Sequence, residues 1–417
     1  MKYILFILSI TVLFSCKNNT QESPTSIKLK EGFWRATLDI QDNEEIPFIF
    51  KVNNSKSLTI YNAEERIEVD EIIITGDSIR IQTPVFEGYF AGRFRESGNR
   101  ITGSFIKPSL DRVVPFKMVY DSNERFEDHY KTRDDKPPYI DITGGWETVF
   151  SASNPEDRYI AKGIFEQNGN IITGTFRTTT GDYRYLEGII NGNEMRLSTF
   201  DGAHAFLFIA KVTDSTMQGQ FYSGNHWKEP FESVKNDKYE LPDEKTLTYL
   251  KEGYDRFDFE FPDTAGKLIS LKDDRFKDKV VIVQILGSWC PNCLEESKFF
   301  RDYLKENPHN DIEFVGLAFE YAKTETKAKE SIQRLIDRLK LPYPVLLAQY
   351  GEGADKKKAQ EKLPMLNHVL SYPTSIYIDK KGKVRRIHTG FNGAATGDTF
   401  VEYTKEFNLF IDELLAE

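Results

Sequence analysis

The chain has 417 residues and a formal net charge of −10, with 39% hydrophobic and 13% aromatic residues. This length exceeds one ordinary domain, so two or three domains are expected. The negative charge disfavours nucleic acid as a partner, because phosphate binding needs a basic surface. The chain has only three cysteines, Cys16, Cys290 and Cys293, which is too few for a scaffold stapled by disulfides.

Residues 1–15 have the pattern of a targeting segment, with a positive start and an apolar run too short to span a membrane. The run ends in Leu13-Phe14-Ser15-Cys16, which resembles the lipobox of a bacterial lipoprotein signal peptide, although Phe14 is bulkier than usual. The resemblance implies lipid on Cys16 and anchorage at the membrane in the bacterial cell envelope, on the periplasmic side. The alternative is an ordinary secretory signal in which Cys16 is incidental. Residues 16–31 are polar and predict a flexible tether.

Two β-rich segments follow, over residues 32–120 and 143–237, joined by a charged linker at 121–142. Short runs of alternating apolar and polar residues, separated by Gly and Asn turn signals, predict antiparallel strands. Parts of the first segment are echoed in the second, which predicts two related barrel-like or sandwich-like units. The echoes pair Gly32-Phe33-Trp34 with Gly144-Gly145-Trp146, Gly98–Phe105 with Gly169–Phe176, and Ile73–Ile81 with Ile189–Leu197.

Aromatic and histidine residues in this β-rich half have no clear functional pattern. Trp34, Trp146 and Trp227 are expected to be core aromatics. His204 and His226 lack the close spacing of metal ligands, so no metal site is predicted.

Residues 238–417 have a different pattern, in which strands alternate with helices. A hairpin around 257–267 precedes a buried strand at 279–286 and a helix after Cys290. The remaining elements are expected in chain order at 312–319 (strand), 326–339 (helix), 343–347 (strand), 354–362 (helix), 375–378 and 383–389 (a hairpin), and 398–415 (helix). This order suits an α/β domain with a mixed sheet flanked by helices.

The sequence Trp289-Cys290-Pro291-Asn292-Cys293 lies where the buried strand turns into the helix. Unpaired N–H groups and the positive end of the helix dipole favour a thiolate on Cys290. Pro291 suits the first helical turn, where its missing N–H costs nothing. Cys293 lies within one turn and can attack a mixed disulfide formed by Cys290, so Cys290 is the expected nucleophile and Cys293 the resolving thiol.

Other uses of a Cys-x-x-Cys pair fit less well. A zinc site needs a second pair of ligands, covalent haem needs His where Leu294 stands, and a structural disulfide closing so short a loop adds little stability. A peroxidatic cysteine would follow a Pro-x-x-x-Thr/Ser-x-x-Cys pattern, which residues 284–290 lack. No cofactor is implied.

The Cys-Pro-Asn-Cys sequence after a buried strand, together with Tyr372-Pro373-Thr374 before another, resembles the thioredoxin-like superfamily. The hairpin that precedes it is similar to the TlpA/ResA branch of envelope thiol-disulfide oxidoreductases. The resemblance implies that Pro373 is cis and faces the cysteines, so that neighbouring backbone pairs with a substrate strand; the alternative is an ordinary turn proline. Tyr372 departs from the small or β-branched residue usual before this proline, and Trp289 is expected to shield the pair.

A proton acceptor for Cys293 is also implied by the resemblance. Thioredoxins have a buried Asp six residues before the first cysteine, where this chain has Gln284. ResA-type relatives place a Glu after the next strand, a position that Glu320 matches. Partial burial would let Glu320 exchange protons near neutral pH, whereas the alternative is a carboxylate in a solvent-exposed loop.

The sequence thus predicts a membrane-anchored enzyme that exchanges disulfides with envelope proteins, in the reducing direction by analogy. Its expected partners are protein thiols and disulfides, together with a thiol protein of the membrane or envelope that donates electrons. The alternative is a lipoprotein whose β-rich half binds a ligand or protein, with the thioredoxin-like domain as an accessory.

Overall fold

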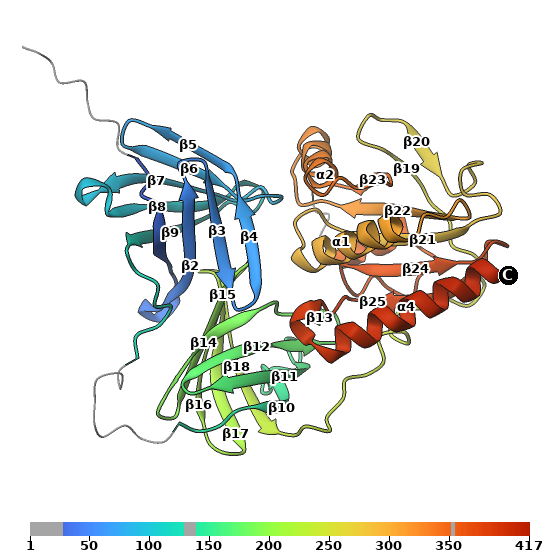
Figure 1. Cartoon of the computed structure of the whole chain (residues 1–417). Coiled ribbons are helices and arrows are strands. Elements are labelled where there is room, and N and C mark those ends of the chain that lie inside the picture. Colours follow the sequence, from blue (N-terminus) through green and yellow to red (C-terminus); the bar gives the residue numbers. More distant parts are fainter. Residues whose placement is uncertain (1–27, 129–138, 352–354) are drawn as a thin grey trace, which may run out of the picture.

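The computed structural model describes residues 28–128, 139–351 and 355–417. Cys16, the predicted signal segment and most of the predicted tether lie outside these residues. Figure 1 shows an all-β half, in blue and green, beside an α/β domain in yellow to red. The prediction of antiparallel β units followed by an α/β domain is therefore confirmed.

The first β unit is one antiparallel sheet of nine strands in the order β4-β3-β2-β1-β9-β8-β7-β6-β5. Its strands are β1 (Gly32–Asp39), β2 (Glu45–Asn54), β3 (Ser57–Asn62), β4 (Glu65–Val69), β5 (Glu71–Thr75), β6 (Ser78–Gln82), β7 (Tyr89–Arg95), β8 (Arg100–Lys107) and β9 (Arg112–Tyr120). Single 3₁₀ turns interrupt it at η1 (Gln41–Asn43), η2 (Glu96–Gly98) and η3 (Pro108–Leu110).

The second β unit is also a nine-stranded antiparallel sheet, ordered β11-β10-β18-β17-β16-β15-β14-β12-β13. Its strands are β10 (Gly144–Phe150), β11 (Tyr159–Asn168), β12 (Ile171–Thr178), β13 (Gly181–Asp182), β14 (Leu186–Asn191), β15 (Glu194–Phe200), β16 (Ala205–Val212), β17 (Thr216–Ser223) and β18 (Trp227–Lys235). Because β12 pairs with both β11 and β14, this sheet closes into a barrel.

The two units share one strand arrangement. If the nine strands of each unit are numbered from 1 to 9 along the chain, both sheets contain the strand order 2-1-9-8-7-6-5. The echo at Trp34 and Trp146 joins the two first strands, and the echo of Ile73–Ile81 joins the fifth and sixth. Gly98–Phe105 lies on the eighth strand of the first unit, but the similar Gly169–Phe176 lies on the third strand of the second unit. These two segments are not equivalent in the fold, so their similarity reflects the composition of hairpins alone.

Two of the three predicted core tryptophans are buried, and they occupy equivalent places. The indole N–H of Trp34 donates to the Lys30 carbonyl at 2.9 Å, and that of Trp146 donates to the Ile142 carbonyl at 2.8 Å. The prediction for Trp227 is wrong, because its side chain is 41% exposed. Trp227 is the first residue of β18, at the end of the sheet, where neighbouring strands do not cover it.

The two units pack against each other through aromatic side chains. Phe200 of the second unit stacks on Phe48 of the first at 4.5 Å between ring centroids. Arg125, which follows the first unit, is buried and donates to the Tyr61 carbonyl at 2.6 Å. The β-rich half therefore forms one continuous packed body.

The C-terminal domain is built on a five-stranded mixed sheet in the order β23-β22-β21-β24-β25, preceded by the hairpin of β19 and β20. Strand β21 is parallel to β22 and antiparallel to β24. The strands are β19 (Glu260–Pro262), β20 (Leu268–Ser270), β21 (Val280–Leu286), β22 (Ile312–Phe319), β23 (Val345–Gln349), β24 (Thr374–Ile378) and β25 (Val384–Thr389). The helices are α1 (Pro291–Glu306), α2 (Glu325–Leu339), α3 (Lys356–Lys362), η4 (Ala394–Thr396) and α4 (Asp398–Ala416).

Strand β21 lies at the centre of this sheet, and every one of its residues is buried. Helices α1 and α4 pack together through Phe300 and Phe407, whose rings stack at 5.8 Å. The predicted first hairpin is shorter than expected, because β19 pairs with only three residues of β20. The strand predicted at 343–347 begins two residues later, at Val345, because Pro344 cannot donate to a ladder.

Candidate functional site: a dithiol at a helix N-terminus

The two cysteines lie at the start of α1, directly after the central strand of the sheet. Cys290 has extended backbone and caps the helix, and Pro291 is the first helical residue. The Cys290 Sγ accepts the backbone N–H of Cys293 at 3.2 Å, and its thiol donates to the Tyr372 carbonyl at 3.4 Å. Cys290 is 6% exposed and Cys293 is fully buried, so Cys290 is the sulfur nearer the surface.

The loop before β24 forms one wall of the site. The Tyr372–Pro373 peptide bond is cis, as predicted. The Pro373 carbonyl accepts the Gly390 N–H at 2.9 Å, while the Tyr372 carbonyl faces the Cys290 sulfur.

An aromatic group covers another side of the site. The Trp289 ring packs on Tyr321 at 4.2 Å and meets the Tyr372 ring edge to face at 5.5 Å. The indole N–H donates to the Phe319 carbonyl at 2.9 Å, which ties Trp289 to the end of β22. The phenol of the bulky Tyr372 therefore takes part in this cover.

Glu320, the sequence-predicted proton acceptor, is buried at the end of β22. Its carboxylate accepts both the backbone N–H of Ser288 at 2.8 Å and the Ser288 hydroxyl at 2.6 Å. Burial raises the pKa of Glu320 to about 7, although the two hydrogen bonds from Ser288 lower it. Both oxygens are thus taken up by the turn that leads into the cysteine pair.

A second buried carboxylate, Glu296, lies on the Cys293 side of the site. Gln284 donates from one amide nitrogen to the Glu296 carboxylate at 2.8 Å and to the Cys293 carbonyl at 3.2 Å. The Ser375 hydroxyl donates to the other Glu296 oxygen at 2.8 Å. Full burial raises the pKa of Glu296 to about 8, and these hydrogen bonds lower it only in part.

The sequence reasoning missed Glu296, although a signal for it existed. Residues three or four apart share one face of a helix, and Cys293, Glu296 and Phe300 follow that spacing. The face that must bury Phe300 therefore buries Glu296 as well.

The environment of Cys293 holds its thiol in the protonated form. Burial, the contact with Cys290 and the charge of Glu296 all raise the pKa of Cys293 well above its ordinary value. Cys293 therefore needs a nearby base before it can act as a nucleophile.

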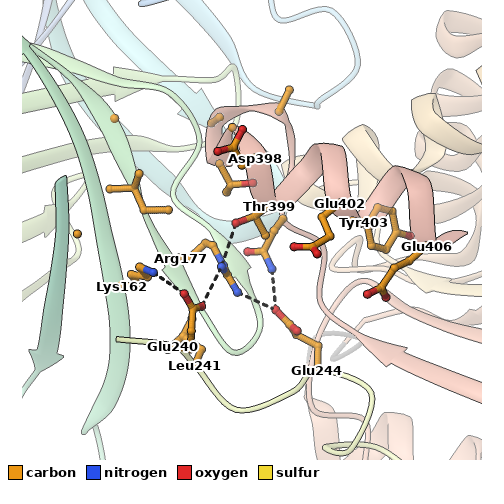
Figure 2. A pocket seen from close by; sticks show the side chains of 18 of the residues that line it. Lys162, Arg177, Glu240, Leu241, Glu244, Asp398, Thr399, Glu402, Tyr403 and Glu406 are labelled. Atoms are coloured by element: carbon orange, nitrogen blue, oxygen red, sulfur yellow. Dashed lines mark hydrogen bonds and ion pairs between the residues drawn. The ribbon is translucent and has the colours of Figure 1, made fainter. Parts of the chain in front are cut away.

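A large pocket of about 830 Å³ lies elsewhere, between the second β unit, residues 237–245 and α4 (Figure 2). Charged side chains line much of it, including Lys162, Arg177 and Glu402. None of the predicted site residues is among those that line it. Within the described residues, no group of His, Cys, Asp and Glu could hold a metal ion, and no helix is both long and apolar enough to cross a membrane.

Comparison with known proteins places the C-terminal domain. Residues 253–387 match the model of the AhpC/TSA family. The Bacillus subtilis protein "Thioredoxin-like protein YneN" is 28% identical over 141 residues, which cover 34% of this chain and 73% of that protein. "Thiol-disulfide oxidoreductase ResA" of Bacillus thuringiensis is 28% identical over 148 residues, 36% of this chain and 73% of that protein.

Solved structures are similar to part of the chain. A thiol-disulfide oxidoreductase from Bacteroides fragilis is 18% identical, with a TM-score of 0.26, over 36% of this chain and 99% of its own. A thiol-disulfide isomerase from Corynebacterium glutamicum is 18% identical, with a TM-score of 0.31, over 40% and 99%.

The C-terminal domain is accordingly a thioredoxin-like domain with its two cysteines at the start of a helix. Its relatives include thiol-disulfide oxidoreductases named ResA. The β-rich half lies outside the matched family model.

Proposed function

We propose that this protein is a membrane-anchored thiol-disulfide oxidoreductase of the bacterial cell envelope. It exchanges disulfides with envelope proteins through Cys290 and Cys293. The single observation that carries the proposal is the position of the Cys290 sulfur, which accepts the Cys293 N–H and faces the Tyr372 carbonyl. A sulfur that accepts a backbone N–H at a helix N-terminus is favoured as the thiolate, the form that attacks a disulfide.

The reaction runs in two exchanges. The Cys290 thiolate attacks one sulfur of the substrate disulfide, forming a mixed disulfide and releasing the first substrate thiolate, which takes a proton. The Cys293 thiolate then attacks the Cys290 sulfur, closing the Cys290–Cys293 disulfide and releasing the second thiol. The enzyme loses two electrons, which reduce the substrate disulfide to two thiols, and an external thiol protein must restore them.

The second exchange requires a base for the Cys293 proton. Glu296 supports this role because Gln284 links its carboxylate to the Cys293 backbone. Glu320 instead accepts two hydrogen bonds from Ser288 and so fixes the turn that leads to Cys290. Trp289, Pro291, Tyr372 and Pro373 form the surroundings that a substrate strand meets.

The location and direction rest on sequence. The lipobox-like residues ending at Cys16 support lipid anchorage, and an extracytoplasmic location supports a role in disulfide exchange. The reducing direction follows from the resemblance to the TlpA/ResA branch, with a membrane or envelope thiol protein as electron donor.

Partner trapping tests the proposal directly. A Cys293→Ser variant lacks the resolving thiol and should accumulate as mixed disulfides with envelope proteins, visible on non-reducing gels and released by dithiothreitol. A Cys290→Ser variant is the matched control and should trap nothing. Equal trapping by both variants, or none by Cys293→Ser, would contradict the assigned roles.

A further inference from the structure

The turn between β12 and β13 of the second β unit rests on the cysteine site. We call residues 178–184 the site turn. The Asn292 side chain donates to the Asp182 carbonyl at 3.1 Å, and the Ser371 hydroxyl donates to the Thr180 carbonyl at 2.9 Å. The Gly393 N–H donates to the Asp182 carboxylate. The site turn thus touches the Cys-x-x-Cys sequence, the residue before the Tyr372–Pro373 pair, and the connection from β25 to α4.

The fit between the two backbones is close. Gly181 has a φ of +136°, and a Cβ added there would lie 2.3 Å from the Asn292 side-chain nitrogen. A Cβ added at Gly390 would lie 2.6 Å from the backbone carbon of Thr180. At Gly390 the added Cβ would clash with backbone, and at Gly181 it would displace the Asn292 amide, so no substrate strand can lie between the site turn and these residues.

Charged side chains hold the site turn from both ends. Arg184 is buried and forms ion pairs with Glu295 of α1 and with Glu65 of the first β unit. On the other side, Arg177 donates to the Thr399 hydroxyl at 3.1 Å, as Figure 2 shows. Both β units therefore contribute to placing this turn, so the placement is built into the fold.

We infer that the site turn is a specificity-determining element that closes one side of the approach to Cys290 beside Pro373. Cys290 then accepts disulfides on short peptides and on flexible segments of envelope proteins, and excludes disulfides held in rigid folded surfaces, which would collide with the turn. Cys290 is only 6% exposed, which leaves a narrow approach to its sulfur.

The exchange is the one already described, with a peptide disulfide as oxidant. The Cys290 thiolate breaks the peptide S–S bond and releases one peptide thiol. Cys293 then releases the second peptide thiol and closes the Cys290–Cys293 disulfide. The pre-reduced protein supplies both electrons, so a single turnover needs no further reductant.

The test compares two disulfides and rests on the proposed oxidoreductase function. The full chain is reduced, freed of reductant and mixed with oxidised glutathione or with insulin. Disulfide formation between Cys290 and Cys293 is followed by acid quenching, alkylation and mass spectrometry. The wild type should react with oxidised glutathione much faster than with insulin.

A Gly181→Ala variant loosens the site turn, because alanine is strained at a φ of +136° and its Cβ displaces the Asn292 amide that donates to the Asp182 carbonyl. The ratio of its reaction rate with insulin to its rate with glutathione should rise about tenfold. Loss of one hydrogen bond changes the fraction of molecules in which the turn rests on the cysteine site by about that factor. Gly169→Ala is the matched control: this glycine lies at the β11–β12 turn of the same unit with a φ of +64° and nothing within 4 Å of the added Cβ. Its ratio should equal that of the wild type.

Ser371→Ala is a second variant that removes only the hydroxyl bonded to Thr180, and its ratio should rise roughly fivefold. An unchanged ratio in a folded Gly181→Ala or Ser371→Ala protein would overturn the inference while leaving the oxidoreductase function intact. Oxidation of the wild type by neither disulfide would instead overturn the proposed function and the inference with it.

Discussion

Gln284 and Glu296 meet beside Cys293, with the amide nitrogen of Gln284 2.8 Å from the Glu296 carboxylate and also donating to the Cys293 carbonyl. The Ser297 hydroxyl donates to the other end of the Gln284 amide at 2.9 Å, which fixes the direction in which the amide points. The residue that replaces the buried Asp of thioredoxins therefore holds a different carboxylate close to Cys293.

Replacing this carboxylate should change the pH dependence of the resolving step. Only ionised Glu296 can accept the Cys293 proton, so in the wild type the rate of resolution should rise as pH increases through about 8. Glu296→Gln should slow resolution by about a hundredfold and remove this rise. The measurement is the release of glutathione from a Cys290–glutathione mixed disulfide, followed in single turnovers across pH.

Glu320→Gln is the matched variant for that experiment. Burial raises the pKa of Glu320 to about 7, but both of its oxygens bond to Ser288. The rise through about pH 8 should therefore persist in Glu320→Gln. Loss of the rise in Glu320→Gln and its survival in Glu296→Gln would reverse the two roles.

The same buried carboxyl should make the protein less stable as pH rises. The pKa of Glu296 is raised from 4.5 to about 8 on folding, so the folded state favours the protonated form. Its contribution to the free energy of unfolding is complete below about pH 4.5 and declines up to about pH 8. By pH 7 the loss is about 3 kcal/mol.

Glu296→Gln should remove that part of the pH dependence. The free energy of unfolding of the C-terminal domain, measured with denaturant from mildly acidic to mildly alkaline pH, should fall less steeply than in the wild type. If the free energy of unfolding of the two proteins falls equally with pH, Glu296 is ionised in the folded state over the whole pH range, contrary to this expectation.

The two thiols should differ in reactivity. Cys293 is fully buried and its pKa is raised, whereas Cys290 reaches the surface. An alkylating agent added to the reduced protein at mildly acidic pH should therefore label Cys290 first, as read from the modified peptides. Equal labelling, or labelling of Cys293 first, would contradict the assignment of nucleophile and resolving thiol.

Removing Arg184 should be costly for the whole chain. Arg184→Met would leave the largely buried Glu65 without its cation and Glu295 with Lys298 alone, at a cost of about 3–5 kcal/mol in the free energy of unfolding. Arg93→Met is the control, since Arg93 and Asp77 are an exposed pair whose loss should cost less than about 1 kcal/mol. Similar losses in the two variants would contradict this account.

Lipid anchorage predicts a simple labelling result. A radiolabelled or clickable fatty acid fed to the expressing bacterium should enter the wild-type protein but not Cys16→Ala. Label retained in Cys16→Ala would remove the lipoprotein assignment and leave an ordinary secretory signal.

Local patterns were sufficient for the central strand and the helix start of the C-terminal domain. The apolar run before Cys290 predicted the buried strand, and the Cys-Pro-Asn-Cys sequence predicted the helix start, because both signals lie in adjacent residues. The cis bond at Pro373 followed from the family resemblance, since no local pattern specifies it.

Features that depend on distant segments escaped prediction. Nothing around Gly181 indicates that its turn will meet Asn292, 111 positions further along the chain. Glu296 looked like one charge among several on a polar helix, because its burial depends on contacts with Gln284 and Ser375 on two strands of the sheet. Trp227 was misjudged for a related reason, since its exposure depends on where neighbouring strands end.

The open sheet of the first β unit has a consequence for how the halves of the chain depend on each other. Strands β4 and β5 end that sheet, and each has only one strand partner in the described structure. Free strand edges invite pairing between molecules. At the corner where β4 passes into β5, Arg338 and Arg334 of α2 bind Asp70 and Glu71. The C-terminal domain therefore covers the corner between the two edge strands of the first β unit. A fragment that lacks this domain should expose that corner and self-associate.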